Sequence, residues 1–303
     1  MKSKMSWLLL ATVTVMVGFS SCDNNDDDGP TGPDNIAGIV ANNPSFSILN
    51  TAINRAGLGA ALSSGSLTVF APDNAAFEAS GITASTVNSL RVSNLDSILK
   101  YHVLGSSVSS GSVPVSDAVT TLLGTRLFAS RNTNGVFVNG IKVKSADVAA
   151  ANGVVHVIER VLIPPTSSIA QIVTADTSFS ILLAAVVKAG LATAVSQPGK
   201  FTVFAPTNAA FRAAGFANAA AIDAAPQATI EAVVKQHVLN TNVFASDLTE
   251  GATPTTLQAN TLTVNLNPVR VKVTGSANAS SNVTTANVVA TNGVIHIIDR
   301  VLL

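Results

Sequence analysis

The sequence predicts an α+β fold that occurs twice along the chain. Two pairs of blocks carry this prediction: TVFAPDNAAF (68–77) recurs as TVFAPTNAAF (202–211), and NGVVHVIERVL (152–162) recurs as NGVIHIIDRVL (292–302). A repeat of this length indicates two domains rather than a solenoid of short units. In each copy, helical periodicity comes first and short β-prone runs follow. This order favours a helical N-terminal layer packed on an antiparallel β-sandwich or wedge.

Each copy is predicted to begin with an amphipathic helix. Apolar residues spaced three or four apart form one stripe, with Ser45 or Ser178 as the predicted N-cap and Gly57 or Gly190 at the end. Such spacing, bounded by a capping serine and a glycine, is typical of a helix with one buried face. The stripe consists of Phe46, Leu49, Ile53 and Ala56 in the first copy and of Phe179, Leu182, Val186 and Ala189 in the second.

A short buried strand and a second helix are expected next. The runs 67–71 and 201–205 are rich in β-branched and aromatic residues, and a proline stops each of them. The residue after each proline is Asp73 in one copy and Thr207 in the other. Both side chains can accept a hydrogen bond from the free amides of a helix's first turn. The repeat thus keeps a predicted N-cap while it changes the residue.

The second half of each copy is predicted to form hairpins. Short β-prone runs alternate with Gly and Asn between residues 119 and 162. The last run, 152–162 or 292–302, is apolar on both of its alternating faces, so we expect a central strand that is covered on both sides. Asn152-Gly153 and Asn292-Gly293 are expected to form the tight turns before it.

The N-terminal residues predict export and a lipid anchor. Lys2 and Lys4 precede an apolar run, 7–19, that is too short to span a bilayer and fits a signal peptide. Ser20 and Ser21 directly before Cys22 are similar to a bacterial lipobox, although an ordinary secretory signal that contains a cysteine is the alternative. Cys22 is the single cysteine, so no disulfide can form within the chain.

The predicted organisation has four parts, and a polar tether separates the leader from the first domain. They are a signal peptide (1–21), a lipidated acidic tether (22–35), a first domain (36–165) and a second domain (166–303). The tether sequence DNNDDDGPTGPDN contains nothing to bury. A calcium loop that starts at Asn24 is disfavoured, because Asn35 would stand where a bidentate glutamate is needed. The linker 164–168 is short and contains two prolines, which predicts a restricted orientation between the domains.

Both copies resemble the fasciclin domain family. The TVFAPTNAAF and NGVIHIIDRVL blocks match its two signatures, and Tyr101-His102 matches the tyrosine–histidine pair that lies between them. In the second copy, Gln236 replaces the tyrosine before His237. The resemblance implies an extracellular, tandem-domain protein that mediates adhesion through proteins or polysaccharides. An acidic run beside a lipidated cysteine also resembles the signal for display on the outer surface of some Gram-negative bacteria.

The residues give little support to catalysis or to a cofactor. His156 and His296 lie in the most apolar strand of each copy, where a neutral, hydrogen-bonded core histidine is the usual outcome. A metal site would need further ligands at suitable spacing, and no GxSxG, GxGxxG or P-loop motif occurs. The net charge is zero, and no basic cluster exceeds the pair Lys142 and Lys144. We therefore expect no enzyme activity, no cofactor, no metal site and no nucleic-acid partner.

The resemblance implies a partner-binding region near the tyrosine–histidine pair. In animal members this region and a nearby acidic-aliphatic segment contact receptors, which would assign Asp96, Ile98, Tyr101 and His102 here, with His237 as the counterpart in the second copy. The apolar spacing of this stretch favours core packing as the alternative. Glycan capture by stacking is disfavoured, because the chain holds one Tyr and one Trp, and Trp7 belongs to the leader.

Taken together, the sequence predicts a non-catalytic, lipid-anchored adhesion or binding module with an extracellular protein or polysaccharide as partner. The expected location is the outer membrane, with the protein exposed at the cell surface; a periplasm-facing orientation is the alternative. A surface glycan-binding protein for polysaccharide capture and a hydrolase with an unrecognised site remain the other functions. Two modules in series can raise avidity for a repetitive target.

Overall fold

The structure is a computed structural model that describes residues 33–113 and 116–303. Residues Pro33–Leu303 form one compact unit. The predicted signal peptide, Cys22 and the acidic run lie outside the described residues. No single helix in the described part of the chain is long and apolar enough to span a membrane; the bent pair Ile169–Ala175 and Thr177–Lys188 meets that test jointly, by length and composition alone. Both members of the pair contribute buried residues to the core of the second domain.

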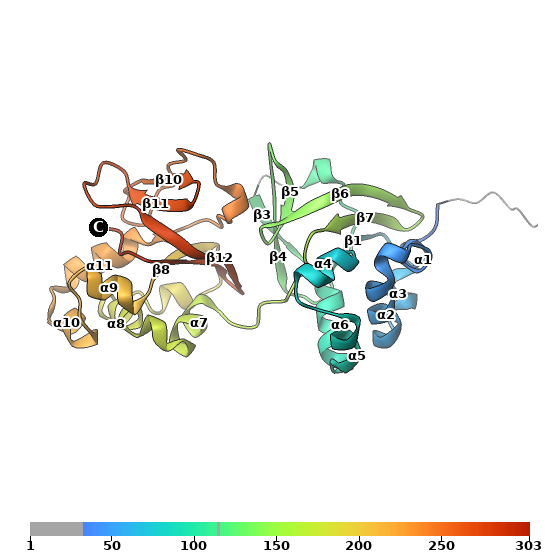
Figure 1. Cartoon of the computed structure of the whole chain (residues 1–303), viewed down its shortest axis with the longest axis horizontal. Coiled ribbons are helices and arrows are strands. Elements are labelled where there is room, and N and C mark those ends of the chain that lie inside the picture. Colours follow the sequence, from blue (N-terminus) through green and yellow to red (C-terminus); the bar gives the residue numbers. More distant parts are fainter. Residues whose placement is uncertain (1–32, 114–115) are drawn as a thin grey trace, which may run out of the picture. The chain divides into compact units, whose positions relative to one another are not determined.

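The first domain places six helices before most of its strands (Figure 1). Its helices are α1 (Ile36–Asn42), α2 (Ser47–Ala56), α3 (Gly59–Leu62), α4 (Asn74–Ala79), α5 (Ala84–Ser89) and α6 (Val92–Tyr101), with 3-10 turns η1 (Pro44–Phe46) and η2 (Ser110–Ser112). Its strands are β1 (Leu67–Pro72), β2 (Val103–Leu104), β3 (Ser116–Thr120), β4 (Arg126–Asn132), β5 (Gly135–Val138), β6 (Ile141–Ala150) and β7 (Gly153–Ile158).

The second domain repeats this order. Its helices are α7 (Ile169–Ala175), α8 (Ser180–Lys188), α9 (Asn208–Ala213), α10 (Ala219–Ala224) and α11 (Gln227–Gln236), with 3-10 turns η3 (Thr177–Phe179), η4 (Ala194–Ser196) and η5 (Ala245–Asp247). Its strands are β8 (Phe201–Pro206), β9 (Val238–Leu239), β10 (Leu262–Leu266), β11 (Val269–Val273), β12 (Ser281–Ala290) and β13 (Gly293–Ile298). The predicted α+β class with two similar domains is confirmed.

The sheet of each domain is mixed. The strand order is β2-β1-β7-β6-β5-β4-β3 in the first domain and β10-β11-β12-β13-β8-β9 in the second. All neighbouring strands are antiparallel except β1 with β7 and β8 with β13, which run parallel. The predicted antiparallel character therefore fails at one pairing per domain. Each signature block supplies one strand of that pair, so the two strands that the repeats share most closely lie side by side in the interior of the sheet.

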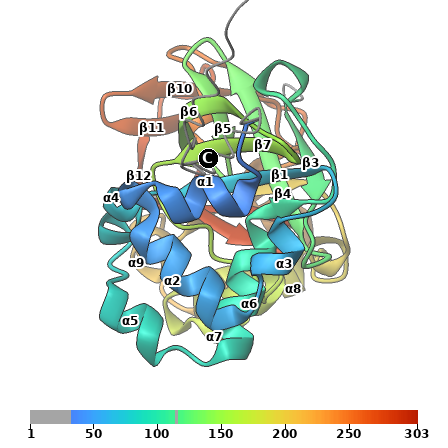
Figure 2. The same ribbon diagram turned by 90° about the vertical axis from the view of Figure 1, so that its right-hand side faces the viewer.

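Two apolar clusters stabilise each domain. One lies between the helices and the central strands, and it includes Phe46, Leu49 and Val155 in the first domain. The other lies within the curled sheet, where Phe70, Tyr101 and Ile158 contribute. In Figure 1 the helices of both domains gather mainly along the lower side and the strands above them, and Figure 2 shows α1, α2 and α3 facing the viewer. Burial of these side chains stabilises the fold by about 1.5–3 kcal/mol for each large apolar residue.

The helix caps agree with the sequence at one position in each copy and differ at another. Asp73 and Thr207 accept from the backbone amides of Ala76 and Ala210, as predicted. Ser45, in contrast, is not the N-cap of the first long helix: it lies inside η1, whose N-cap is Asn43. The same holds for Ser178, since Asp176 caps η3. The sequence pattern missed the 3-10 turn, which begins one residue before the serine and has its N-cap two residues before it.

The two Asn-Gly turns hold the helical layer against the central strands. Asn152 accepts from the amide of Ile36 at 2.9 Å and donates to the carbonyl of Leu62 at 2.9 Å. Asn292 accepts from Ile169 and donates to Val195 in the same way, at 2.9 and 2.8 Å. The asparagine of each signature is thus a turn residue whose side chain also hydrogen-bonds the helical layer.

Candidate functional site

The tyrosine–histidine pair lies inside the first domain. Tyr101 is 0% exposed. Its hydroxyl donates to the carbonyl of Arg126 at 3.0 Å and accepts from the Asn139 amide at 2.8 Å. Burial raises the pKa of Tyr101 to about 12, against a smaller lowering by the Asn139 hydrogen bond, so the hydroxyl remains protonated.

His102 and His237 join a helix to the end of the same domain. His102 Nδ1 donates to the Ile98 carbonyl at 2.8 Å, while Nε2 accepts from the Leu162 amide at 2.9 Å. His237 makes the same two bonds, to Val233 at 2.7 Å and from Leu302 at 2.9 Å. Burial lowers the pKa of both imidazoles to about 4. Both rings are therefore neutral at pH 7 and have no free nitrogen for catalysis.

The remaining two histidines lie on β7 and β13 and hydrogen-bond each strand to a loop of the same domain. His156 Nε2 donates to the Val108 carbonyl at 2.9 Å, and the ring stacks on Phe70 with centroids 5.5 Å apart. His296 repeats this arrangement with Val243 at 2.8 Å and Phe204 at 5.4 Å. In the part of the chain that the structure describes, no group of three or more His, Cys, Asp or Glu side chains could hold a metal ion.

The predicted partner-binding residues divide into buried and accessible ones. Asp96 and Ile98 lie half-buried on α6, and Asp96 forms an ion pair with Lys100 at 3.0 Å. Tyr101, His102 and His237 are at most 2% exposed. This corrects the expectation for these three side chains, because a partner cannot touch them while the domain is folded. Core packing was the alternative interpretation of this stretch. The hydrogen bonds of the three side chains to neighbouring backbone groups agree with it.

Tyr101 supports a turn at the junction of the two domains. Its partner Asn139 has a positive φ of 48° and precedes Gly140 in the β5–β6 turn. A Cβ on Gly140 would lie 2.6 Å from the Asn287 amide nitrogen and 3.0 Å from the Phe244 ring, both in the second domain. The turn therefore packs closely against the second domain, and the Tyr101 hydroxyl fixes the side chain of the residue beside the contact.

Further contacts at the junction are polar and aromatic. Ser130 donates to the Asp247 carboxylate at 2.5 Å, and Asn132 donates to the Ser246 carbonyl at 2.8 Å. The rings of Phe128 and Phe244 are 5.9 Å apart. All of these contacts connect β4 with η5 or with Phe244, the N-cap residue of η5. They agree with the restricted orientation that the short linker predicts.

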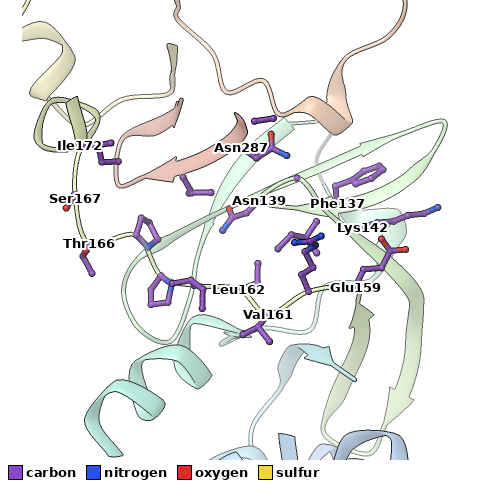
Figure 3. Close-up of a pocket in the computed structure, with 18 residues that line it drawn as sticks. Phe137, Asn139, Lys142, Glu159, Val161, Leu162, Thr166, Ser167, Ile172 and Asn287 are labelled. Carbon is purple, nitrogen blue, oxygen red and sulfur yellow. The ribbon is translucent and has the colours of Figure 1, made fainter. Parts of the chain in front are cut away.

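A groove of about 800 Å³ lies beside these contacts (Figure 3). Figure 3 shows Lys142 and Glu159 at one end, Asn139 and Asn287 near the centre, and Thr166 and Ser167 at the other end. The linker forms part of the wall and exposes Ile163 at 56%. Charged side chains of both signs stand beside apolar surface along the groove. The full lining is Phe137, Asn139, Gly140, Ile141, Lys142, Glu159, Arg160, Val161, Leu162, Ile163, Pro164, Pro165, Thr166, Ser167, Ile172, Ala286, Asn287 and Val289.

Comparison with known proteins identifies the family. The sequence profile of the Fasciclin domain matches residues 44–164 and 177–303. The chain belongs to the Fasciclin domain family. Each matched segment contains the complete parallel strand pair, β1 with β7 or β8 with β13, to which the two signatures contribute one strand each.

Individual relatives come from animals and bacteria. The chain is 33% identical over 245 residues to transforming growth factor-beta-induced protein ig-h3 of Oryctolagus cuniculus, which covers 79% of this chain and 35% of the relative. It is 32% identical over 159 residues to the cell surface glycolipoprotein MPB83 of Mycobacterium bovis, covering 48% of this chain and 70% of the relative. A solved FAS1 domain pair from the insect cell adhesion molecule fasciclin I has a TM-score of 0.42 at 20% identity, over 87% of this chain and 98% of that one. The chain spans about a third of the length of ig-h3.

The groove is the feature that sequence reasoning missed. Its residues come from the β5–β6 turn and the strand ends beside it, the segment after β7, the linker, α7 and β12, which are far apart in the sequence. One signal was present: the turn between β5 and β6 is the short pair Asn139-Gly140 in the first copy, whereas the corresponding connection between β11 and β12 in the second copy is the longer segment 274–280. Glycine allows the close approach at the junction, whereas the counterpart turn does not form this contact.

We expect Tyr101→Phe to lower the free energy of unfolding by about 1–2 kcal/mol, because Asn139 and the Arg126 carbonyl lose a buried partner. The ring itself is retained, so packing is unchanged. Urea unfolding measures this effect. Gln236→Leu is the matched control at the counterpart position: Gln236 has one buried nitrogen without a partner among the described residues, so its removal should cost less. An equal or larger loss in the control would contradict the role assigned to the tyrosine.

Proposed function

We propose that this chain is a non-catalytic adhesion module of the bacterial cell surface, anchored by lipid at Cys22 and exposed from the outer membrane. Membership of the Fasciclin domain family supports the adhesion role. The relative MPB83, a cell surface glycolipoprotein by name, supports the surface location and the lipid anchor. The partner is an extracellular protein or polysaccharide, and the chain meets the membrane through its N-terminal lipid.

The groove at the domain junction is the observation that carries this proposal. Its volume of about 800 Å³ lies within the range of ligand-binding clefts. Lys142, Glu159 and Arg160 are exposed along it, so a partner with charges of both signs can pair there. Salt bridges at such an exposed rim steer association and contribute modestly to affinity.

A protein segment fits the groove better than a polysaccharide. Sugar rings are usually held by exposed aromatic side chains, and the one aromatic residue in the described lining, Phe137, is 8% exposed. The linker instead exposes aliphatic surface at Ile163, with Pro164 and Pro165 half-buried beside it. An extended peptide could pack on this surface while its charged side chains reach Lys142 and Glu159. A surface glycan remains the second candidate partner.

The α6 surface is a second candidate contact region within the same function. Asp96 and Ile98 are its accessible members, since Tyr101 and His102 act from inside the domain. The ion pair of Asp96 with Lys100 leaves both side chains partly exposed, at 31% and 40%. We propose that this region contributes to recognition beside the groove.

Charge reversal in the groove tests the proposal. We expect Lys142→Glu combined with Arg160→Glu to weaken binding of the soluble fragment 33–303 by about tenfold, because two favourable contacts become repulsive. Binding is measured by surface plasmon resonance against panels of extracellular matrix proteins and of surface polysaccharides.

The matched control is Lys272→Glu, a charge reversal on β11 away from the groove, which should leave affinity unchanged. Ile98→Ala in the same assay tests the α6 surface. If the groove variant binds as tightly as the wild type while Ile98→Ala weakens binding, the partner binds at α6 and not in the groove. If the fragment binds no member of either panel, the adhesion function itself is refuted for these partner classes.

A further inference from the structure

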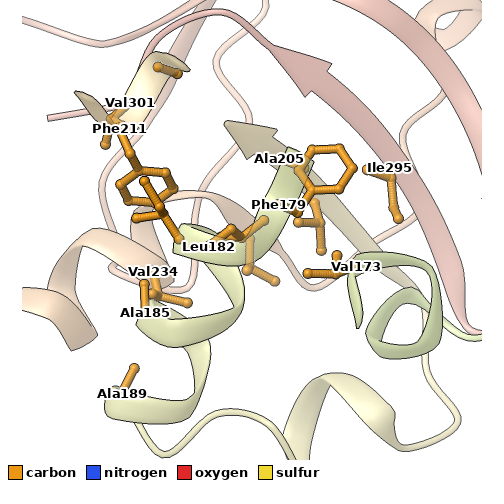
Figure 4. Packing of buried hydrophobic residues seen from close by; sticks show 14 of the residues in the cluster. Val173, Phe179, Leu182, Ala185, Ala189, Ala205, Phe211, Val234, Ile295 and Val301 are labelled. Carbon is orange, nitrogen blue, oxygen red and sulfur yellow. The ribbon is translucent and has the colours of Figure 1, made fainter. Parts of the chain in front are cut away.

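The second domain contains an apolar pocket that the proposed adhesion function does not use. Its volume is about 180 Å³. Helices α7, α8 and α11 and the 3-10 turn η4 form its walls, and strands β8 and β9 form its floor. Figure 4 shows Val173, Leu182 and Val234, which belong both to this lining and to the main core cluster. The pocket opens beside Thr174 and Ser196, which are exposed.

The first domain offers an internal comparison. Its pocket at the corresponding place holds about 40 Å³. Three lining positions differ by one methylene each: Ile53, Leu62 and Leu99 in the first domain correspond to Val186, Val195 and Val234 in the second. Smaller side chains at the same backbone positions leave the larger space, because a close-packed core compensates only partly for lost atoms.

The pocket presents almost no polar group to an occupant. His237 is the one titratable residue in the described lining, and both of its ring nitrogens are already engaged, by Val233 and Leu302. At the opening, the hydroxyls of Thr174 and Ser196 donate to the carbonyls of Ala170 and Ala192. Water in the pocket would therefore find few partners, and the space favours an apolar occupant over water.

We infer that this pocket is a binding site for a small, uncharged, apolar molecule of about the size of a single aromatic ring. A dry cavity of about 150 Å³ with aliphatic walls is large enough to bind benzene, and the present pocket is of similar size with similar walls. A charged ligand is excluded, because no lining group can neutralise it. The site lies in the second domain alone, since the counterpart in the first domain is too small for a ring.

Toluene tests this inference on the soluble fragment 33–303. We expect saturable changes in the methyl NMR signals of Leu182, Val195 and Val234, with no such changes at Leu49 and Leu62 of the first domain. Benzoate, which has the same ring and a negative charge, should cause none. The double variant Val195→Leu and Val234→Leu restores the larger residues of the first domain, and we expect it to weaken toluene binding at least tenfold.

Val187→Leu is the matched control, because Val187 is on α8 but 61% exposed and outside the pocket. It should bind toluene as the wild type does. If the double variant does not fold, Val186→Ile at the rim replaces it, and the wild-type methyl map remains decisive. No saturable change up to the solubility limit of toluene, or equal affinity in the filled variant, would overturn the inference.

Discussion

Replacement of Gly153 by alanine is expected to lower the free energy of unfolding of the first domain by roughly 3 kcal/mol or more. Gly153 has a φ of +148° and pairs with Leu67 across the parallel strands β1 and β7. A Cβ there would lie 1.9 Å from the Leu67 carbonyl oxygen. That atom belongs to the backbone, so the overlap is relieved only if the two central strands move apart. Urea unfolding of the fragment 33–303, followed by circular dichroism, measures the loss.

Gly65→Ala is the matched control for this substitution. Gly65 also has a positive φ, +83°, but nothing lies within 4 Å of a Cβ at that position. It therefore carries the backbone strain without the collision, and a loss of about 1 kcal/mol is expected. Gly293→Ala should reproduce the large effect in the second domain, where the Cβ would lie 2.1 Å from the Phe201 carbonyl oxygen. Equal losses for Gly153→Ala and Gly65→Ala would mean that the strand contact is not the cause.

Local signals in the sequence predicted much of each domain. Asp73 and Thr207 cap their helices because an N-cap depends on amides within three residues along the chain. The Asn-Gly turns are equally local. The central position of β7 and β13 followed from their double-sided apolar pattern. Each of these predictions rests on a property that neighbouring residues determine.

The errors and omissions concern contacts between distant residues. The parallel pairing of β1 with β7 joins residues 86 positions apart, such as Leu67 and Gly153, and strand propensity does not specify the direction of the partner strand. Burial of Tyr101 and His102 was one of two alternatives, because apolar spacing shows which face is buried but not which polar group finds a partner there. The groove forms where the β5–β6 turn lies against β12, and no local sequence pattern predicts a contact between these two segments.

Lowering the pH from 7 to 4.5 is expected to remove about 2 kcal/mol of stability through each of His102 and His237. Burial lowers their pKa from 6.5 to about 4 in the folded state. Between these two values the unfolded chain binds a proton at each site and the folded chain does not, so stability falls as the pH falls. Above about 6.5 both states are neutral and the contribution is constant; below about 4 the folded state also binds the proton. Burial lowers the pKa of His296 as well, which adds to the loss in the same direction. Urea unfolding at intervals of half a pH unit measures the slope.

His102→Gln and His237→Gln assign the slope to each domain. Each variant is expected to be less stable at pH 7, because the backbone amide of Leu162 or Leu302 loses the acceptor nitrogen of the ring. The difference in stability between pH 7 and pH 4.5 should nevertheless shrink by about 2 kcal/mol, since one site no longer takes up a proton on unfolding. Carboxylates with lowered pKa values, such as Asp117 and Asp147, start from 3.8 in the unfolded chain and lose their contribution mainly below the range tested. A slope that both glutamine variants leave unchanged would show that these imidazoles take up protons equally in the folded and the unfolded state. Burial would then not lower their pKa, which would contradict the neutral rings that accept from Leu162 and Leu302.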